Sequence, residues 1–381
     1  MARGGLNNKH RPNNLTDSHP HVYVTGFSSL IDRITFASRT HRERSTAWEL
    51  NFAMSRLRCA VAALILGASR AAEVALIRTM WGVERFDHVE QWPALFQDLA
   101  KSNYSGVEAP TWVVCGVGPT FSRWHECDES RSTAFRAALQ ASGLLYIAQV
   151  HTCGYPIASA SPRDHLGSLH ALLVFAKGEL GADFANVHGG VDFWSPVEML
   201  EFFRGAKTLQ EWERRLIPAT ISHETHRMRA LSTPMAASLV LDAVPGVRLT
   251  ADLSHWVVGA ERLFDFPSDA GWWPKLLQKV ADATVLTHAR VEAPREIQVA
   301  DPAAPEHREL LATYEAWWAQ IWAAQAAREG VVYVEAEFGP TPYMPALPHT
   351  LQPLASLHNA VEFVGQRQRR RLMEGVCRAV P

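Results

Sequence analysis

The sequence has no apolar run that approaches the roughly 20 residues of a transmembrane helix. It has no excess of either charge, because 37 Lys and Arg residues face 39 Asp and Glu residues, which leaves a net charge of −2. Its five cysteines are scattered, and no two of them form a CxxC pair. These absences argue against a membrane-spanning protein, a general nucleic-acid binder, a zinc knuckle and a disulfide scaffold. They predict reduced thiols in an intracellular protein.

Two short catalytic motifs are also incomplete. Gly116-Val-Gly118 leads to Phe121 at the position where a dinucleotide-binding fingerprint needs its third glycine. His223-Glu-Thr-His226 is one residue shorter than the HExxH motif of metalloproteases, and it lies at the end of a predicted strand. The sequence therefore predicts neither a dinucleotide fingerprint nor a protease helix.

The composition is that of an ordinary globular protein, with 47% hydrophobic and 20% charged residues among 381. Residues 1–72 differ, since the first forty mix Asn, Ser, Thr, His and Arg without sustained periodicity, and we expect a disordered or loosely attached extension. Residues 54–72 have a basic start, a short apolar run and small residues, a pattern that fits a signal peptide, a transit peptide or an over-long gene model. The catalytic domain is predicted over residues 73–381.

From residue 73 onward, short apolar runs alternate with helical patterns. The predicted strands cover residues 74–81, 106–108, 144–151, 183–188, 219–224, 247–253, 284–288 and 331–337. The predicted helices cover residues 90–101, 128–142 (capped by Asp128), 162–180, a segment opened by Ser195-Pro196, 234–243, 269–282, 305–329 and 356–376. Eight strand–helix units in one chain favour a closed (β/α)8 TIM barrel over an open doubly wound sheet.

Two further stretches carry expectations. The apolar run 111–118 resembles an extra strand that reshapes the pocket mouth or forms an oligomer contact. The aromatic residues of the helix over 305–329 recur at helical spacing, so we expect them to form the inward stripe of an outer helix rather than a binding box. This stripe contains Tyr314, Trp317, Trp318, Ile321 and Trp322.

Polar residues stand at the carboxyl ends of six predicted strands, where the active sites of such barrels lie. In chain order they are His151, His188, Glu224, Asp252 with His255, His288, and Glu337. Three carboxylates and one imidazole, from Glu224, Asp252, His288 and Glu337, make a mostly oxygen site. Such a site suits one Mn²⁺, Mg²⁺ or Co²⁺ ion, with Zn²⁺ as an alternative, and burying three carboxylates without a cation would be very costly.

The motifs at these strand ends resemble those of the xylose isomerase-like TIM-barrel superfamily, which includes sugar isomerases, epimerases and endonuclease IV. The resemblance spans about residues 73 to 370. It is carried by Glu224-Thr-His-Arg227, Asp252-Leu-Ser-His255-Trp256, His288-Ala-Arg290 and Glu337-Phe-Gly-Pro-Thr-Pro-Tyr-Met344. It implies one divalent metal held by Glu224, Asp252, His288 and Glu337, with His255 and Arg290 binding substrate oxygens. Glu292-Ala-Pro-Arg295 departs from the usual glycine after the seventh strand, so the substrate loop is expected to differ.

Such a site predicts proton transfer in a small sugar or a polyol-derived ketone. A metal stabilises the enediolate, and carboxylates on opposite sides of the substrate remove a proton and return one. Glu224 and Glu337 are the predicted pair, and His151 and His188 are expected to line the pocket with His255 and Arg290. Isomerisation, epimerisation and loss of a β-hydroxyl as dehydration remain open.

Other interpretations also remain open. An endonuclease IV-like phosphodiesterase acting on damaged DNA is the second hypothesis, although Asp301-Pro-Ala303 has no histidine where the nucleases carry an Asp-x-His pair. A barrel without turnover, serving as a scaffold, is the third. At single positions, Asp252 could cap a helix, His255 could be a hydrogen-bonded structural histidine, and Glu335 shares the strand face of Glu337.

The predicted partners are a small-molecule substrate, no nucleic acid and no membrane, with a homo-oligomer left open. The predicted location is the cytoplasm. A secreted or organelle-targeted protein is the alternative if residues 1–72 are a processed segment.

Overall fold

The computed structural model describes residues 72–119 and 126–375 of the chain. The predictions made for residues 1–71 lie outside this part, as do Phe121, Cys59 and Cys377. The strands of the described part are β1 (Glu73–Thr79), β2 (Gly106–Pro110), β3 (Leu145–His151), β4 (Phe184–His188), β5 (Thr220–Glu224), β6 (Leu249–Ala251), β7 (Thr284–His288) and β8 (Val331–Ala336).

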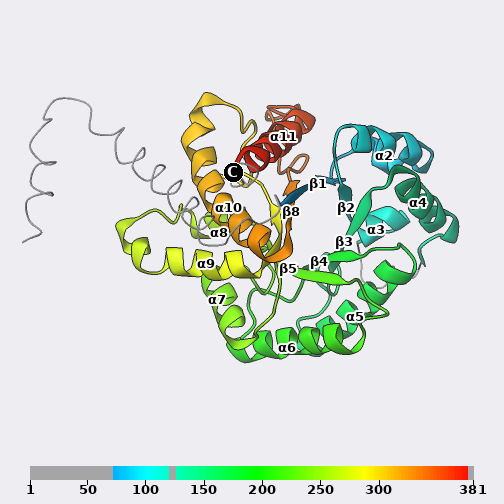
Figure 1. Cartoon of the computed structure of the whole chain (residues 1–381), viewed down its shortest axis with the longest axis horizontal. Coiled ribbons are helices and arrows are strands. Elements are labelled where there is room, and N and C mark those ends of the chain that lie inside the picture. Colours follow the sequence, from blue (N-terminus) through cyan, green and yellow to red (C-terminus); the bar gives the residue numbers. More distant parts are fainter. Residues whose placement is uncertain (1–71, 120–125, 376–381) are drawn as a thin grey trace, which may run out of the picture. The chain divides into compact units, whose positions relative to one another are not determined.

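These eight strands form a closed parallel barrel, as the sequence predicts (Figure 1). Each strand pairs with the next one in the chain, and β8 pairs with β1 to close the ring. Closure aligns six residue pairs between these last two strands, from Glu73 beside Val331 to Arg78 beside Ala336. Because all strands are parallel, their carboxyl ends gather at one end of the barrel.

Helices surround the barrel and connect its strands (Figure 1). They are α2 (Trp92–Lys101), α3 (Thr111–Cys115), α4 (Glu129–Ser142), α5 (Pro162–Gly178), α6 (Pro196–Trp212), α7 (Pro234–Ala243), α8 (Ser254–Ala260), α9 (Trp273–Ala283), α10 (Arg308–Glu329) and α11 (Leu357–Gly375). Both predicted N-caps are present: Asp128 accepts a hydrogen bond from the Ser130 amide, and Ser195 forms a capping box with Glu198. No helix in the described part is both long enough and apolar enough to cross a membrane.

The aromatic stripe of α10 is buried, as predicted, and belongs to the main hydrophobic core. Trp317 contacts Trp273 of α9 with a ring distance of 5.1 Å. The Trp322 indole donates a hydrogen bond to the Thr287 hydroxyl at 3.1 Å. The stripe therefore joins two outer helices to the barrel wall.

Two local predictions were wrong. Residues 111–115 form α3 rather than an extra strand, and the helix ends at Gly116, whose φ is +67°. Their β-branched and aromatic side chains suit a strand locally, but this preference depends strongly on tertiary context, and here the segment packs against α4 with Val114 and Cys115 in the main core. The predicted helix 269–282 is divided into a 3-10 helix, Pro267–Gly271, and α9. Pro274 lies in the first turn of α9, where a proline fits a helix start but could not continue a preceding helix.

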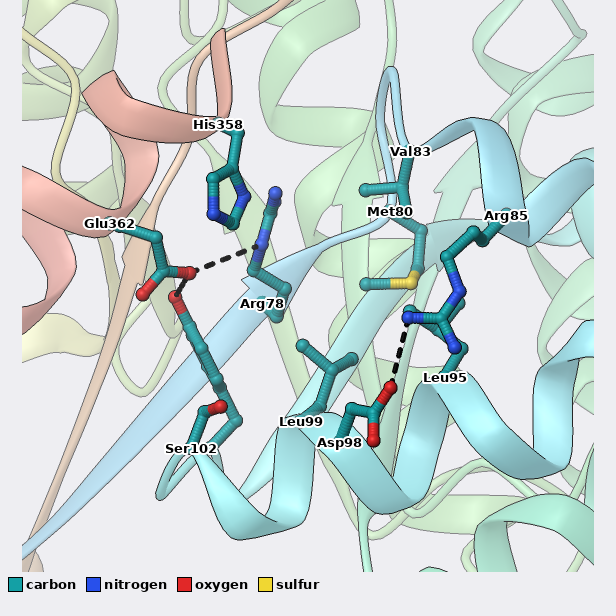
Figure 2. A pocket seen from close by; sticks show the side chains of 11 residues that line it. Arg78, Met80, Val83, Arg85, Leu95, Asp98, Leu99, Ser102, His358 and Glu362 are labelled. Atoms are coloured by element: carbon teal, nitrogen blue, oxygen red, sulfur yellow. Dashed lines mark hydrogen bonds and ion pairs between the residues drawn. The ribbon is translucent and has the colours of Figure 1, made fainter. Parts of the chain in front are cut away.

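A cavity of about 350 Å³ lies outside the barrel wall, with a lining drawn from β1, α2, α11 and the segments near them (Figure 2). Arg78 of β1 is 5% exposed and donates a hydrogen bond to its neighbour's carbonyl, Thr79 O, at 2.6 Å. Its Nε lies 4.0 Å from Glu362 of α11, which accepts the Tyr104 hydroxyl at 2.6 Å. The residues lining this cavity include none of those predicted for the site.

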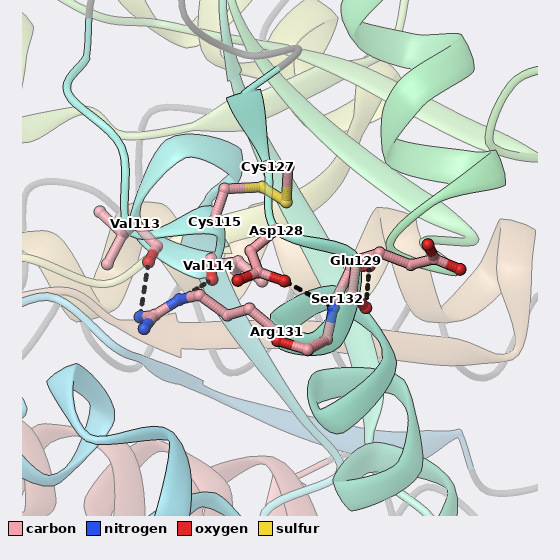
Figure 3. Close-up of a disulfide and its surroundings, with 9 residues drawn as sticks. Val113, Val114, Cys115, Cys127, Asp128, Glu129, Arg131 and Ser132 are labelled. Atoms are coloured by element: carbon pink, nitrogen blue, oxygen red, sulfur yellow. Dashed lines mark hydrogen bonds between the residues drawn. A yellow bond between two sulfur atoms is a disulfide. The ribbon is translucent and has the colours of Figure 1, made fainter.

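Cys115 and Cys127 form a disulfide, which corrects the prediction of reduced thiols for these two residues (Figure 3). They are 12 residues apart, one at the end of α3 and the other directly before the N-cap of α4. Arg131 of α4 also donates a hydrogen bond to Val114 O, so the same two helices are joined twice. No motif spacing marks this pair, because the packing of α3 against α4 brings the two cysteines together. Among the described residues, Cys153 is a buried free thiol.

Candidate metal centre

The interior of the barrel changes from apolar to polar along the strands. A small apolar cluster lies farther from the carboxyl ends of the strands and contains Ile77, Ile147, Phe184, Val285 and Leu286. Residues two apart on a strand face the same side. The interior face therefore continues on β3 through Gln149 to His151, and on β4 through Asn186 to His188. Polar side chains thus occupy the carboxyl end of the barrel.

The four residues predicted to hold a metal converge at this end. Glu224 ends β5, Asp252 follows β6, His288 ends β7 and Glu337 follows β8. One potential ligand atom from each lies within 4.8 Å of the others, and all four residues are buried. The structure brings together the set named from the sequence, and its binding of a cation remains a prediction.

The unpaired atoms of this group fit a shared cation. Glu224 Oε1, His288 Nδ1 and Glu337 Oε2 are buried without a hydrogen-bond partner in the described part of the chain. His288 Nδ1 lies 3.1 Å from Glu337 Oε2 and 3.6 Å from Glu224 Oε2. Buried polar atoms are normally satisfied, and a divalent cation would satisfy all three at once. The donor set, mostly oxygen with one imidazole, suits a hard ion.

The electrostatics of the group point the same way. Burial acts to lower the pKa of His288, but Glu337, Glu108 and Glu224 outweigh it and raise this pKa well above its usual value. Burial likewise acts to raise the pKa of Glu224, yet the His188 and His288 imidazoles hold it well below its usual value. The space between the four candidate ligand residues therefore strongly favours a positive charge.

Asp252 has one carboxylate oxygen turned toward helix α8. Its Oδ1 accepts a hydrogen bond from the Ser254 amide at 3.0 Å and another from the Ser254 hydroxyl, and its Oδ2 accepts from Arg290 Nη2. Burial raises the pKa of Asp252 to about 6, against the opposing effect of Arg290. Asp252 is not the N-cap residue of α8, which is Leu253, but one of its oxygens binds the first residue of that helix and the other lies on the side of the ligand group.

Arg290 and His255, both predicted to bind substrate, contact each other. Arg290 Nη2 lies 2.7 Å from His255 Nε2, and Arg290 Nε donates to Ser254 Oγ at 3.1 Å. Glu292 lies 3.2 Å from the same Nε, and burial raises the pKa of Glu292 to about 7. Arg290 Nη1, at 3.7 Å from Glu337, is the part of the guanidinium with the fewest protein contacts. Arg290 therefore contacts both Asp252 and His255, and its role in binding a substrate remains a prediction.

His151 and His188 stack face to face at a ring distance of 4.0 Å. His188 Nε2 lies 2.8 Å from Glu224 Oε2, which places this imidazole beside the ligand group. His151 is one step farther out, where its Nε2 contacts Gln149 Oε1 and its Nδ1 faces Arg229. His188 thus contacts a predicted ligand directly, and His151 lines the site behind it.

Several residues of the site were missed in the sequence prediction. Glu108, Gln149 and Asn186 form a buried layer below the predicted ligands, and Glu335 is buried beside them. Strand parity had already marked Glu335 as a residue on the face of Glu337, and the same signal could have found Gln149 and Asn186, which precede His151 and His188 by two positions. Glu108 lies in the predicted strand 106–108, yet it was not included among the polar strand ends. His226 was also missed; it offers a ligand atom within 4.8 Å of those of His188 and Glu224.

No protein-family model matches the chain, and no curated protein matches its sequence. Solved structures do resemble it. A D-allulose 3-epimerase from Methylomonas sp., solved in complex with D-allulose, is 12% identical; the match covers 80% of this chain and 97% of that one, with a TM-score of 0.48. A probable 3-DHS dehydratase from Bacillus anthracis, AsbF, is 12% identical over 70% of this chain and 92% of its own, with a TM-score of 0.43. An AP endonuclease of family 2 from Brucella melitensis is 15% identical over 71% and 94%, with a TM-score of 0.43.

These neighbours are xylose isomerase-like barrel enzymes, the group that the sequence motifs resemble. At these identities and TM-scores the likeness concerns the fold alone. The three names also describe three different reactions.

Proposed function

We propose that this chain is a metal-dependent isomerase or epimerase that acts on a small sugar or a polyol-derived ketone. The observation that carries the proposal is the convergence of Glu224, Asp252, His288 and Glu337 at the carboxyl end of the barrel. Burying three carboxylates around one imidazole is costly, and a shared divalent cation offsets that cost.

In this proposal the four residues hold one Mn²⁺, Mg²⁺ or Co²⁺ ion, with Zn²⁺ as the alternative. When bound, such an ion polarises a substrate carbonyl and makes the neighbouring C–H bond more acidic. The remaining chemistry belongs to the side chains of the chain itself.

Glu224 and Glu337 are the proposed proton-transfer pair. The His288 and Arg290 cations lower the pKa of Glu337 to about 2 despite its burial, and Glu224 is also held below its usual value, so both are carboxylates at neutral pH. A carboxylate can accept the proton of the acidified C–H, and its conjugate acid can return one. Return to the opposite face gives epimerisation, and return to the neighbouring carbon gives isomerisation.

The other predicted residues would orient the substrate. His188 lies beside Glu224, and Arg290 Nη1 and His255 lie beside Glu337 and Asp252, respectively. These groups can hold substrate hydroxyl or carbonyl oxygens between the two carboxylates. Loss of a β-hydroxyl after the same proton abstraction would make the enzyme a dehydratase, which is the alternative reaction for this set of residues.

A phosphodiesterase of the endonuclease IV kind is the second candidate. His188, Glu224 and His226 form another group with ligand atoms within 4.8 Å, and it shares Glu224 with the first group, as a site with several metal ions requires. Against it, His151 faces Arg229 and Gln149 rather than a metal group. Asp301 is exposed and accepts a hydrogen bond from the Ala303 amide in its own turn.

The proposed partner is a small-molecule substrate, and a homo-oligomer remains an open alternative. The cytoplasmic location stays a prediction. The Cys115–Cys127 disulfide favours its alternative, because stable disulfides are typical of secreted or otherwise oxidising compartments.

The metal content of the purified full chain, measured by inductively coupled plasma mass spectrometry, tests the proposal first. About one ion per chain is expected, and two or three zinc ions per chain would instead support the phosphodiesterase. The loaded protein is then incubated in D₂O with ketoses and aldoses, and deuterium at the carbon next to the carbonyl is followed by NMR. No bound metal after reconstitution, or no exchange with any sugar or polyol ketone, would contradict the isomerase.

Glu337→Gln tests the acid–base assignment within the same assay. At saturating Mn²⁺ it should keep the fold and lose deuterium exchange, because an amide cannot accept the proton. Glu315→Gln, a buried acid of α10 outside the barrel wall, is the matched control and should retain exchange. Exchange at the wild-type rate in metal-loaded Glu337→Gln would remove Glu337 from the proton-transfer pair.

A further inference from the structure

Below the candidate ligands lies a second polar layer that the proposed reaction does not use. Glu108 of β2 is its centre and is 1% exposed. Its Oε1 accepts hydrogen bonds from Gln149 Nε2 and Asn186 Nδ2, each at 3.1 Å. Two amides from the neighbouring strands β3 and β4 thus hold one oxygen of the Glu108 carboxylate in a set place.

The second oxygen of Glu108 reaches a predicted metal ligand. Oε2 lies 3.3 Å from His288 Nε2, across 180 residues of sequence. The other ring nitrogen, Nδ1, faces Glu224 and Glu337 and has no hydrogen-bond partner in the described part of the chain. The His288 ring therefore lies between Glu108 on one side and the candidate ligands on the other.

The same layer reaches a second ligand through Asn186. The Asn186 amide nitrogen lies 3.1 Å from Glu108 Oε1 and 2.6 Å from Glu224 Oε2. One amide thus connects the Glu108 carboxylate with the Glu224 carboxylate. Two of the four candidate ligands, His288 and Glu224, are joined to Glu108 directly or through this amide.

This arrangement matters for an imidazole ligand because only one nitrogen of a neutral ring carries the proton. A carboxylate beside Nε2 keeps the proton there, which leaves the Nδ1 lone pair free for a metal, and it also fixes the plane of the ring. Packing alone would not require a carboxylate at position 108, because burying a charged group is costly and the layer below is apolar.

We propose that Glu108 is a positioning residue of the metal centre. It sets the tautomer and orientation of His288, and through Asn186 it restrains Glu224. The inference rests on the proposed metal site and deepens it, because it assigns a role to a residue outside the ligand set.

The test compares Mn²⁺ binding and metal-free stability in two isosteric variants of the full chain. In Glu108→Gln, the Mn²⁺ dissociation constant from isothermal titration calorimetry should rise by about 10- to 100-fold, as for other outer-shell partners of metal ligands. The melting temperature of the metal-free protein should not fall, since a buried charge has been removed. Glu315→Gln changes a buried acid of α10, outside the barrel wall and away from the candidate ligands, and should bind Mn²⁺ with the affinity of the wild type.

A spectroscopic measurement separates positioning from a merely structural effect. Co²⁺ bound to the wild type and to Glu315→Gln should give the same visible absorption spectrum, whereas Co²⁺ in Glu108→Gln should give a shifted one because His288 is no longer held. A lower metal-free melting temperature together with unchanged Mn²⁺ affinity and an unchanged spectrum would overturn the proposal and leave Glu108 a structural residue.

If Glu108→Gln does not fold, Gln149→Met decides the question. It leaves Glu108 in place and removes one of the hydrogen bonds that hold it, so a weakening of Mn²⁺ binding of a few fold is expected and wild-type affinity would overturn the proposal. A wild-type protein that binds no metal would overturn the proposed function as well. Equal binding by the wild type and Glu108→Gln would overturn this inference alone.

Discussion

At the scale of single residues, Asp252 does two things at once. One oxygen accepts the amide of Ser254 at the start of α8, and the other accepts Arg290 on the side of the candidate ligands. A capping aspartate and a metal ligand are usually considered alternatives for one position. Here the strand ends at Ala251 and α8 begins at Ser254 after its N-cap residue Leu253, so the carboxylate of Asp252 can bind the first residue of the helix and face the site.

Asp252→Asn should therefore weaken metal binding more than it affects the fold. The amide can still accept the Ser254 bonds, but it loses the negative charge that a divalent ion requires, so we expect at least about a 100-fold weaker Mn²⁺ affinity by calorimetry. Asp301→Asn is the matched control, because Asp301 makes the same kind of turn bond, to Ala303, at an exposed position. Equal Mn²⁺ affinity in the two variants would remove Asp252 from the ligand set.

His165 of α5 is a second residue with a measurable signature, away from the candidate ligands. Its ring contacts Thr152 Oγ1 through Nδ1 and Ser159 O through Nε2. Burial lowers the pKa of His165 to about 4, below the usual value of 6.5. Between pH 4 and 6.5, the His165 imidazole therefore binds a proton in the unfolded chain but not in the folded chain. The contribution of His165 to the free energy of unfolding is complete above pH 6.5 and is lost as the pH falls toward 4.

His165→Gln should flatten this pH dependence. When the pH is lowered from 7 to 4, the free energy of unfolding of the wild type, measured with urea, should fall by about 2 kcal/mol because of His165, after allowance for solvent screening. The variant should start less stable at pH 7 and lose less on acidification. His88→Gln, at an exposed position, should keep the wild-type slope. Parallel curves for the wild type and His165→Gln would contradict the linkage.

At the scale of elements, the segment between β2 and α4 differs most from its sequence prediction. Residues 111–115 form α3, and the disulfide links its end to the residue before the N-cap of α4. The two errors have one cause. A short apolar run with two cysteines nearby predicts a strand and free thiols. In the structure, α3 packs against α4, and this packing brings Cys115 next to Cys127.

The double variant Cys115→Ser/Cys127→Ser should be less stable by roughly 2–4 kcal/mol, because the cross-link restricts the unfolded chain. Urea unfolding of the variant and the wild type measures this difference. Cys153→Ser is the control for loss of a cysteine outside the cross-link.

Alkylation provides the direct check. In denatured protein that has not been reduced, mass spectrometry should find Cys153 labelled and Cys115 and Cys127 unlabelled. Labelling of all three would mean that the thiols are reduced, as the sequence alone predicts.

At the scale of the whole molecule, the barrel is closed by β1 and β8, and both lie within residues 73–336. All eight strands are thus contained in the predicted domain 73–381. Deleting residues 1–72 should leave a folded barrel with the melting temperature and Mn²⁺ affinity of the full chain, measured by circular dichroism and calorimetry.

A longer deletion, of residues 1–79, is the control. It also removes β1 and should unfold the protein, because an open sheet would expose the edges of β2 and β8. Insoluble protein after the shorter deletion would show that the domain begins earlier than residue 73.

The sequence by itself determined the barrel and the identity of its strand-end residues. Strands buried on both faces are almost entirely apolar, so Glu224, Asp252, His288 and Glu337 stand out at their ends, and eight repeated units leave little choice of fold. Strand parity, which placed Glu335 on the face of Glu337, also held enough information to place Gln149 and Asn186 in the interior, although it was not applied to them.

Only the tertiary structure decided which polar atoms are already paired. Arg290 was expected to face the substrate, and most of its nitrogens are taken by Asp252, Ser254, His255 and Glu292. Glu108 meets His288 from 180 residues away. Such contacts depend on how the closed barrel places one strand opposite another, and the distance between two such side chains cannot be inferred from a local sequence pattern.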